Sequence, residues 1–182
     1  DLSRETARLG RRIDNLLALA RLEAGRSRPN PEPTPPADLF RAAREALPLL
    51  LDAHPVHVAV ERTCPDLYVD PSLALEVLVN LLENAARAAP AGTAVELSAA
   101  PHPLGRERVR IEVADRGPGF TERGPGQEET GPSDVARRGL GLEIVRGLTA
   151  ASGGDVALLR RPGGGTVARL DFPAAPEPEE AR

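Results

Sequence analysis

The stretch VLVNLLENAARAAP, residues 77–90, has two distinct faces when it is wound into a helix. At about 100° per residue, Asn80, Asn84 and Arg87 fall within an arc of roughly 60°, and the leucines fall on the opposite side. Asparagine is unfavourable inside a helix because its side chain competes for backbone hydrogen bonds. A solvated polar face is one interpretation, but two asparagines four residues apart indicate a function for this face.

The ends of this helix are marked by residues with known capping preferences. Asp70 is suited to cap the N-terminus, and Pro71 stands in the first turn, where proline is favoured. Pro90 and Gly92 then stop the helix. We therefore expect a helix over residues 71–89, with an apolar side for packing and a polar side for binding.

Two glycine-containing segments downstream add complementary groups. DRGPG, residues 115–119, offers the carboxylate of Asp115 beside glycines that let a flat ring approach the backbone. RGLGLEIV, residues 138–145, places glycines at the start of a further helix. The polar helix face supplies neutral oxygens for a metal ion and a cation for phosphate. Together these parts predict a site for a magnesium nucleotide.

The composition narrows the class of protein. Of the 182 residues, 41% are hydrophobic and 27% are charged, as in a soluble globular protein of one domain plus an appendage. The net charge of -4, with three phenylalanines and one tyrosine, argues against a nucleic-acid surface. Cys64 is the single cysteine, which fits a reducing compartment. No apolar run approaches the roughly 18 residues of a membrane span, and the absence of methionine indicates a piece of a longer protein.

The first 25 residues show the spacing of a coiled coil or a helical bundle. Steps of four and three join Leu2, Thr6, Leu9, Ile13, Leu16 and Ala20. Leu17, Leu19 and Leu22 widen the apolar face, and Gly25 follows as a helix stop. A single helix of this kind needs a partner, so we expect dimerisation or a neighbouring helix outside this chain. Docking on the following domain is the alternative.

Composition divides the rest of the chain into a linker, a domain and a tail. Residues 26–37 (RSRPNPEPTPPA) form a proline-rich linker, and the tail 174–182 has the composition of a disordered segment. Within the domain, residues 38–173, alternating apolar residues predict strands near 56–60, 95–97, 109–113, 156–158 and 166–172. Helices near 38–53, 71–89 and 139–152 provide cover for one face of the sheet, which gives a two-layer α/β sandwich.

A stretch without hydrophobic periodicity, TERGPGQEETGPSDVARR, fills residues 121–138. A loop this long inside a compact domain is commonly functional or disordered. Its position between the Asp115 loop and the next helix predicts a mobile lid over the site. An inert insertion is the alternative.

In this order, the segments resemble the ATP-binding catalytic domain of bacterial sensor histidine kinases, in the superfamily shared with gyrase, Hsp90 and MutL. VLVNLLENAARAAP (77–90) resembles the N box of that family, DRGPGF (115–120) its first glycine box and GLGLEIVRGL (139–148) its second. GGGT (163–166) resembles the turn before the last strand. LGRRIDNLLALARLEAG (9–25) resembles the second helix of the dimerisation and histidine-phosphotransfer domain. The resemblance covers nearly the whole chain and implies the Bergerat-type ATP-binding fold.

The resemblance implies roles for individual side chains around ATP. Asp115 would accept a hydrogen bond from the adenine amino group, and Thr166 would support the adenine through water. Asn84 would bind Mg²⁺ through its amide oxygen, with Asn80 as a second ligand or as the holder of a metal-bound water. Arg87 would meet the phosphates.

Backbone positions complete the implied ATP site. Gly117 and Gly119 would admit the adenine ring, and glycine amides of the second box would meet phosphate at a helix N-terminus. The second-box residues assigned to the site are Arg138, Gly139, Leu140, Gly141 and Leu142.

The chain departs from the family pattern at three points. None of His54, His57 and His102 stands on an expected helix before an acidic residue, as the phosphoacceptor of the family does. The lid lacks the phenylalanine-rich box that the family often carries. Arg137 stands where a glycine commonly begins the second box, so Arg137 or Arg138 is a candidate for contact with the γ-phosphate. We therefore expect the acceptor upstream of this chain, which alone should bind ATP but not phosphorylate itself.

These expectations describe the ATP-binding core of a two-component sensor histidine kinase. The intact protein would pass the γ-phosphoryl group of ATP to a histidine and then to an aspartate of a response regulator. Its expected partners are ATP, its own phosphotransfer domain in a homodimer, and the response regulator. Its expected location is the cytoplasm, with any membrane anchor upstream. Two alternatives are a degenerate nucleotide-binding or dimerisation module without kinase activity, and an anti-sigma-type serine kinase, against which the helix at 9–25 argues.

Overall fold

The computed structural model describes residues 28–119 and 132–176, with Leu49 and residues 132–140 described by their backbone alone. In the N-terminal segment it describes Gly10, Ile13, Leu16, Leu17, Leu19, Ala20, Ala24 and Gly25. Most of the expected lid, residues 121–131, and the last tail residues, 177–182, lie outside the described residues.

A five-stranded sheet forms one layer of the domain. Its spatial order is β2 (Val56–Val60), β4 (Val95–His102), β5 (Gly105–Ala114), β7 (Thr166–Pro173) and β6 (Asp155–Arg160). β2 runs parallel to β4, and the other neighbours pair antiparallel. All the strands expected from the sequence are therefore present.

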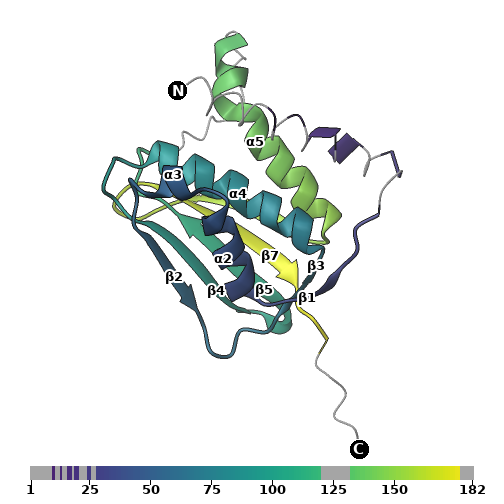
Figure 1. Ribbon diagram of the computed structural model, residues 1–182. Coiled ribbons are helices and arrows are strands. Elements are labelled where there is room, and N and C mark those ends of the chain that lie inside the picture. Colours follow the sequence, from purple (N-terminus) through teal and green to yellow (C-terminus); the bar gives the residue numbers. More distant parts are fainter. Residues whose placement is uncertain are drawn as a thin grey trace, which may run out of the picture.

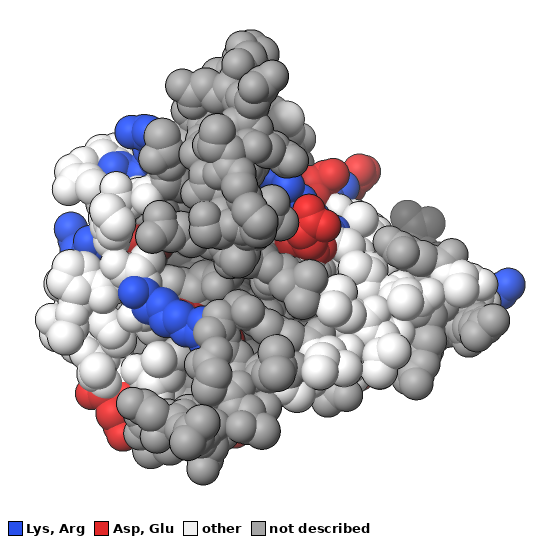
Figure 2. All heavy atoms as spheres, turned by 90° about the horizontal axis from the view of Figure 1, so that it is seen from above, with Lys and Arg blue, Asp and Glu red and all other residues white. Residues whose placement is uncertain are grey.

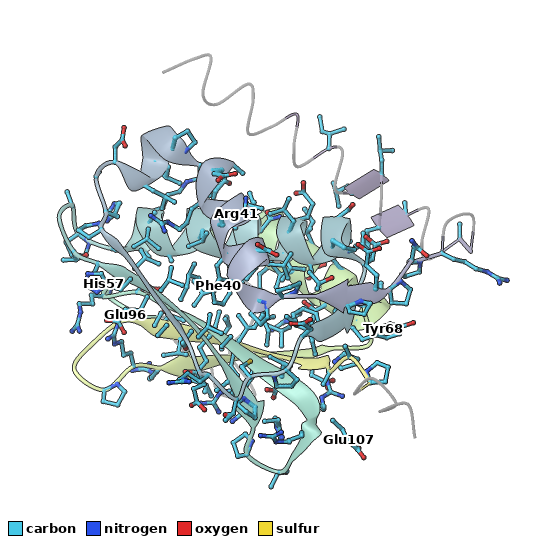
Figure 3. The ribbon with its side chains drawn as sticks, turned by 60° about the horizontal axis from the view of Figure 1, so that its bottom comes forward. Phe40, Arg41, His57, Tyr68, Glu96 and Glu107 are labelled. Carbon is cyan, nitrogen blue, oxygen red and sulfur yellow. The ribbon has the colours of Figure 1, made fainter. Side chains whose placement is uncertain are left out.

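Helices form the second layer. α2 (Pro36–Glu45), α4 (Pro71–Ala88) and α5 (Pro132–Ala151) all lie over the same face of the sheet (Figure 1). The space between the layers is filled by side chains that include Phe40, Leu78, Leu82, Leu97, Ile111, Leu170 and Phe172. Phe40, for example, lies between α2 and the sheet (Figure 3) and is 1% exposed. The expected two-layer α/β sandwich is confirmed.

The limits of α4 are those predicted from its capping residues. The Asp70 side chain accepts hydrogen bonds from the N–H groups of Ser72 at 3.0 Å and Leu73 at 3.4 Å. Pro71 occupies the first turn, where a missing N–H has no cost. The leucine face of the helix is buried against the sheet, so packing and capping agree on where the helix lies.

The expected helix over residues 38–53 is wrong as a single element. α2 ends at Glu45, and a separate short helix, α3 (Pro48–Leu51), follows. Pro48 disfavours helical conformation in the residue before it, and Leu47 has φ -129° and ψ 39°. The chain therefore turns at Leu47, and Pro48 starts α3 from a first-turn position.

The expected linker, residues 26–37, is wrong for its second half. β1 (Glu32–Thr34) pairs antiparallel with β3 (Leu67–Val69), and α2 begins soon after it. A proline inside a sequence argues against a central strand, but a short edge strand tolerates it. The folded domain therefore begins before residue 38.

The C-terminal boundary also moves outward. Ala174 forms a bridge with Leu67 of β3, and the N–H of Ala175 donates to the carbonyl of Asp66 at 2.7 Å. The start of the expected tail is thus paired with the domain, and both ends of the domain attach at β3.

α5 begins at Pro132 and not near Gly139, as the sequence led us to expect. The residues before Gly139 carry no apolar period, but a first-turn proline and a run of alanine and arginine are compatible with a helix. The helix therefore takes in the last part of the stretch that we expected to be a lid.

The N-terminal segment is helical at its described residues up to Ala20, and it contacts α5 through Leu19. Leu16 packs against the core, and a Cβ at Gly147 of α5 would lie 2.5 Å from Cδ1 of Leu19. Ile13 and Leu17 are 50% and 49% exposed. One side of this helix thus docks on the domain through Leu16 and Leu19, and the side with Ile13 and Leu17 is exposed.

The face of the sheet away from the helices carries paired charges. Arg110 donates to both carboxylate oxygens of Asp171, at 2.8 and 3.0 Å, and Arg169 donates to Glu112 at 2.7 Å. Both pairs join directly opposite residues of β5 and β7. Burial disfavours the ionised form of Asp171, but hydrogen bonding and charge from Arg110 outweigh it and hold its pKa below the ordinary value. This face therefore needs no second layer.

Thr149 provides a test of the packing beneath α5. It is 0% exposed, and its hydroxyl has no hydrogen-bond partner within the described structure. Thr149→Val keeps the shape and removes this unsatisfied group, so we expect the free energy of unfolding in urea to rise by about 1 kcal/mol. Thr149→Ser, which keeps the hydroxyl and loses the methyl group, should instead lower it. A less stable valine variant would show that the hydroxyl has a partner.

Candidate functional site

Asn80 and Asn84 meet α5 at a glycine. Asn80 is 6% exposed, and its Nδ2 donates to the carbonyl of Glu76, one turn earlier, at 2.8 Å. A Cβ at Gly141 would lie 3.7 Å from Oδ1 of Asn80 and 3.8 Å from Oδ1 of Asn84. Nδ2 of Asn84 would lie 3.7 Å from the same Cβ, so the two side-chain amides lie around one point of α5, where a glycine leaves room beside them.

Arg87 lies one turn beyond this pair and contacts a buried carboxylate. Its Nη2 lies 3.4 Å from Oε2 of Glu83. The side chain of Glu83 is 9% exposed and that of Arg87 is 35% exposed. Sequence analysis did not select Glu83, although its place three residues after Asn80 puts it on the same polar stripe of the helix.

Asp115 follows directly after β5 and is 5% exposed. Its Oδ1 accepts hydrogen bonds from the N–H groups of Gly117 at 2.7 Å and Thr166 at 3.3 Å. The N–H of Asp115 in turn donates to the carbonyl of Thr166 at 2.9 Å. The backbone of two segments thus fixes this carboxylate through Oδ1, and no bond to Oδ2 occurs in the described part of the chain.

The turn before β7 packs against the Asp115 loop and requires glycine. Gly163, Gly164 and Gly165 have φ values of +84°, +103° and +108°. A Cβ at Gly165 would lie 2.1 Å from the carbonyl oxygen of Asp115, and one at Gly119 would lie 3.2 Å from the carbonyl oxygen of Gly165. The two glycine segments therefore lie backbone against backbone, which no larger residue at 165 would permit.

Charged side chains support the Asp115 loop from the sheet. Nη2 of Arg161 donates to Glu96 at 2.7 Å, and its Nη1 lies 3.4 Å from the carbonyl oxygen of Asp115. Arg116 also approaches Glu96, at 3.5 Å. The hydrogen bond from Arg161 is the main cause that lowers the pKa of Glu96, which is labelled in Figure 3. This cluster, which the sequence did not reveal, links the loop to β4.

Gly117 brings the loop to the end of α4. A Cβ at Gly117 would lie 2.7 Å from the carbonyl oxygen of Ala88, the last residue of the helix. At about 1.5 Å per residue, the helix advances about 12 Å from Asn80 to Ala88. The asparagine pair, Arg87 and the Asp115 loop are therefore brought together along half of one helix.

The expected role of the second glycine box at a helix N-terminus is wrong as stated. Gly139 and Gly141 lie inside α5, because the helix begins at Pro132. Amides in a helix interior bond to carbonyls of the preceding turn and do not point at a ligand. Gly141 instead gives α5 its close approach to the asparagine pair, and Leu142 is half-buried beside it. The side chains of Arg137, Arg138 and Leu140 lie outside the described residues.

The donor set fits a hard cation better than a transition metal. No group of three or more His, Cys, Asp and Glu side chains that could hold a metal occurs among the residues described. Amide oxygens such as those of Asn80 and Asn84 are ligands that suit Mg²⁺.

Described acidic and basic side chains are scattered among neutral ones on the face seen from above (Figure 2).

Comparison with known proteins identifies the family. The sequence signature described as "Histidine kinase-, DNA gyrase B-, and HSP90-like ATPase" matches residues 69–176, more than half of the chain. The chain belongs to this ATPase family. The matched segment contains α4, the Asp115 loop and the glycine turn before β7.

Individual relatives agree with this family. The sensor protein KdpD of Escherichia coli (strain K12) is 33% identical over 178 residues, which cover 93% of this chain and 20% of KdpD. Full-length ShkA in complex with AMPPNP has a TM-score of 0.68 and 28% identity over 92% of this chain and 36% of that chain. The Acinetobacter baumannii histidine kinase AdeS shares the fold, with a TM-score of 0.69 at 20% identity over 89% of this chain and 76% of that chain.

This ATPase domain thus corresponds to only part of the length of the relatives that it matches. The chain spans a fifth of the length of KdpD, and 36% of ShkA. No helix among the described residues combines the length and apolarity needed to cross a membrane.

Proposed function

We propose that this ATPase domain is the ATP-binding core of a two-component sensor histidine kinase. The observation that carries the proposal is the arrangement along α4 of the amide pair, Arg87 and the Asp115 loop. The sensor protein KdpD and the histidine kinase AdeS among the similar proteins support this class of kinase.

The proposed binding mode places adenine at the Asp115 loop and phosphates toward Arg87. The buried carboxylate of Asp115 would accept a hydrogen bond from the adenine amino group. This contact is specific, because Asp115 has little exposure to water that could replace the adenine donor. Thr166 would support adenine through water, and Gly117 and Gly119 would admit the ring. Arg87 would neutralise phosphate charge, so that binding positions the γ-phosphoryl group for transfer.

The proposed metal ligand is Asn84, with Asn80 as its neighbour. Mg²⁺ would supply charge neutralisation of the phosphates when bound. The amide nitrogen of Asn80 already donates to the backbone carbonyl of Glu76, and this hydrogen bond orients the amide oxygen of Asn80. The exposed amide of Asn84 is the group with more freedom to meet a hydrated ion.

Asn84→Ala tests the metal proposal directly. Calorimetric titration of the chain with a slowly hydrolysed ATP analogue, with and without Mg²⁺, measures how much the metal strengthens binding. We expect the variant to lose at least about tenfold of affinity in the presence of Mg²⁺ and little in its absence, because an outer-sphere or direct ligand is removed. Asn30→Ala removes an exposed amide outside α4 and serves as the control. An equal loss with and without Mg²⁺ would count against ligation.

The phosphoryl acceptor is proposed to lie outside this chain. His54 is buried with Nδ1 3.2 Å from the carbonyl oxygen of Thr93, His57 lies in β2, and Nε2 of His102 lies 3.6 Å from Asp171. All three histidines of the sequence are therefore in or beside strands, and none is on a helix. In the proposed reaction an imidazole nitrogen of the acceptor would take the γ-phosphoryl group, and ADP would leave.

Adding a dimerisation and phosphotransfer domain with γ-labelled ATP tests the whole proposal. Acid-labile label on a histidine of that domain is the expected result, and transfer of the label to a response regulator would follow. Tight nucleotide binding without label would favour a binding module without kinase activity. Acid-stable label would favour a serine kinase of the same superfamily.

A further inference from the structure

Glu83 is a buried carboxylate that the binding mode above does not use. Its side chain is 9% exposed, and it stands between Asn80 and Asn84 in the sequence, one turn before Arg87 on α4. A carboxylate in such a place is unfavourable unless a positive partner compensates for the lost hydration. Arg87 is a positive partner on the same helix, with Nη2 at 3.4 Å from Oε2 of Glu83.

The geometry of this pair controls where the arginine lies. Glu83 precedes Arg87 by four residues, the order in which glutamate and a basic residue pair best on a helix. An arginine side chain has many rotamers, and its guanidinium carries five N–H donors in a planar fork, so one group can contact a carboxylate and a second anion together. Glu83 is itself held by burial, so it is a fixed anchor for a side chain that is 35% exposed.

We propose that Glu83 is a positioning residue that orients Arg87 toward the phosphates of the nucleotide. This inference rests on the proposed function, in which Arg87 meets those phosphates. Glu83 itself touches no nucleotide atom in this proposal. Its effect passes through the guanidinium, which it holds at the α4 side of the site and keeps from turning into solvent.

Glu83→Gln tests the inference, because it keeps the size of the side chain and removes its charge. ATP and adenosine, each with Mg²⁺, are titrated into the variant and the wild-type chain by calorimetry. We expect the affinity for ATP to fall about tenfold, as when one charge-assisted contact is lost, and the affinity for adenosine to stay unchanged. Glu45→Gln removes the carboxylate of an exposed Arg–Glu pair on α2, away from the site, and should leave both affinities as they are.

A double-mutant cycle shows whether Glu83 acts through Arg87. In an Arg87→Gln background, Glu83→Gln should cost no further ATP affinity, because the group that it orients is gone. Arg87→Lys gives a second approach that leaves Glu83 intact. It keeps the positive charge but loses the fork that the carboxylate holds, so it should also lower the affinity for ATP and spare adenosine.

The outcomes separate this inference from the proposed function. If the wild-type chain is folded and binds neither ATP nor adenosine, both proposals fail. If the wild type binds ATP and Glu83→Gln binds it equally well, the positioning role alone is wrong. An equal loss for ATP and adenosine, or an additive loss in the Arg87→Gln background, also overturns it, since a structural role for Glu83 would then be sufficient.

Discussion

Asp115→Asn is expected to weaken ATP binding by roughly 100-fold or more while the fold stays intact. The amide oxygen of asparagine can keep the hydrogen bonds that Oδ1 now accepts from the N–H groups of Gly117 and Thr166. The amide nitrogen then takes the place of Oδ2, so an N–H donor replaces the acceptor that the proposed mode aims at the adenine amino group. Two donors face each other, and in a site this buried neither can turn to water.

Calorimetric titration with a slowly hydrolysed ATP analogue measures this effect, and urea unfolding checks the fold. Asp155→Asn, which removes an exposed carboxylate at the start of β6, is the matched control and should leave affinity unchanged. Because adenine recognition is the target, GTP binding should not suffer the same loss as ATP binding. An unchanged affinity for ATP would remove Asp115 from the adenine role.

Gly165→Ala is expected to destabilise the domain by about 3 kcal/mol or more. The new Cβ would lie 2.1 Å from the carbonyl oxygen of Asp115, at a φ of +108° that L-residues rarely adopt. To remove this steric conflict, the Asp115 loop must move away from β7. That movement breaks the hydrogen bonds between Thr166 and Asp115. Stability and ATP affinity should therefore fall together.

Gly163→Ala is the control for Gly165→Ala because it separates backbone strain from steric conflict. Gly163 also has a positive φ, +84°, but a Cβ there would meet nothing within 4 Å. Replacing Gly163 by alanine should lower the free energy of unfolding by only about 1 kcal/mol, the usual penalty for alanine at a positive φ. Urea unfolding of both variants gives the comparison. Equal losses would mean that the contact with Asp115 contributes nothing.

The sequence predicted the elements whose signals are local. The limits of α4 followed from Asp70, Pro71 and a period of 3.6, and the strands followed from alternation. β1 was missed because Pro33 and the prolines on either side of the strand resemble a linker, and its stability comes from pairing with β3, more than thirty residues away. The early start of α5 was missed because its first turns have no apolar period.

The candidate site was predictable in its residue types but not in its contacts. The asparagine pair and the Asp115 loop were selected because unusual residues stood at regular positions. Arg161 and Glu96 were not, because they are 65 residues apart and meet through the strand order of the sheet. The burial of Glu83 likewise depends on how neighbouring elements cover α4. The spacing of apolar residues along one helix does not predict that cover.

The attachment of both domain ends at β3 has a mechanical consequence. β1 lies along one edge of β3 and Ala174 bridges to Leu67 on the other, so the chain enters and leaves the domain at one place (Figure 1). A pull between these two ends acts first on the short contacts that β3 makes with β1 and with Ala174. Because β3 leads directly into α4 through Asp70, and Asp70 accepts a hydrogen bond from the N–H of Asn30, such a load is applied next to the N-terminus of the helix that carries the asparagine pair.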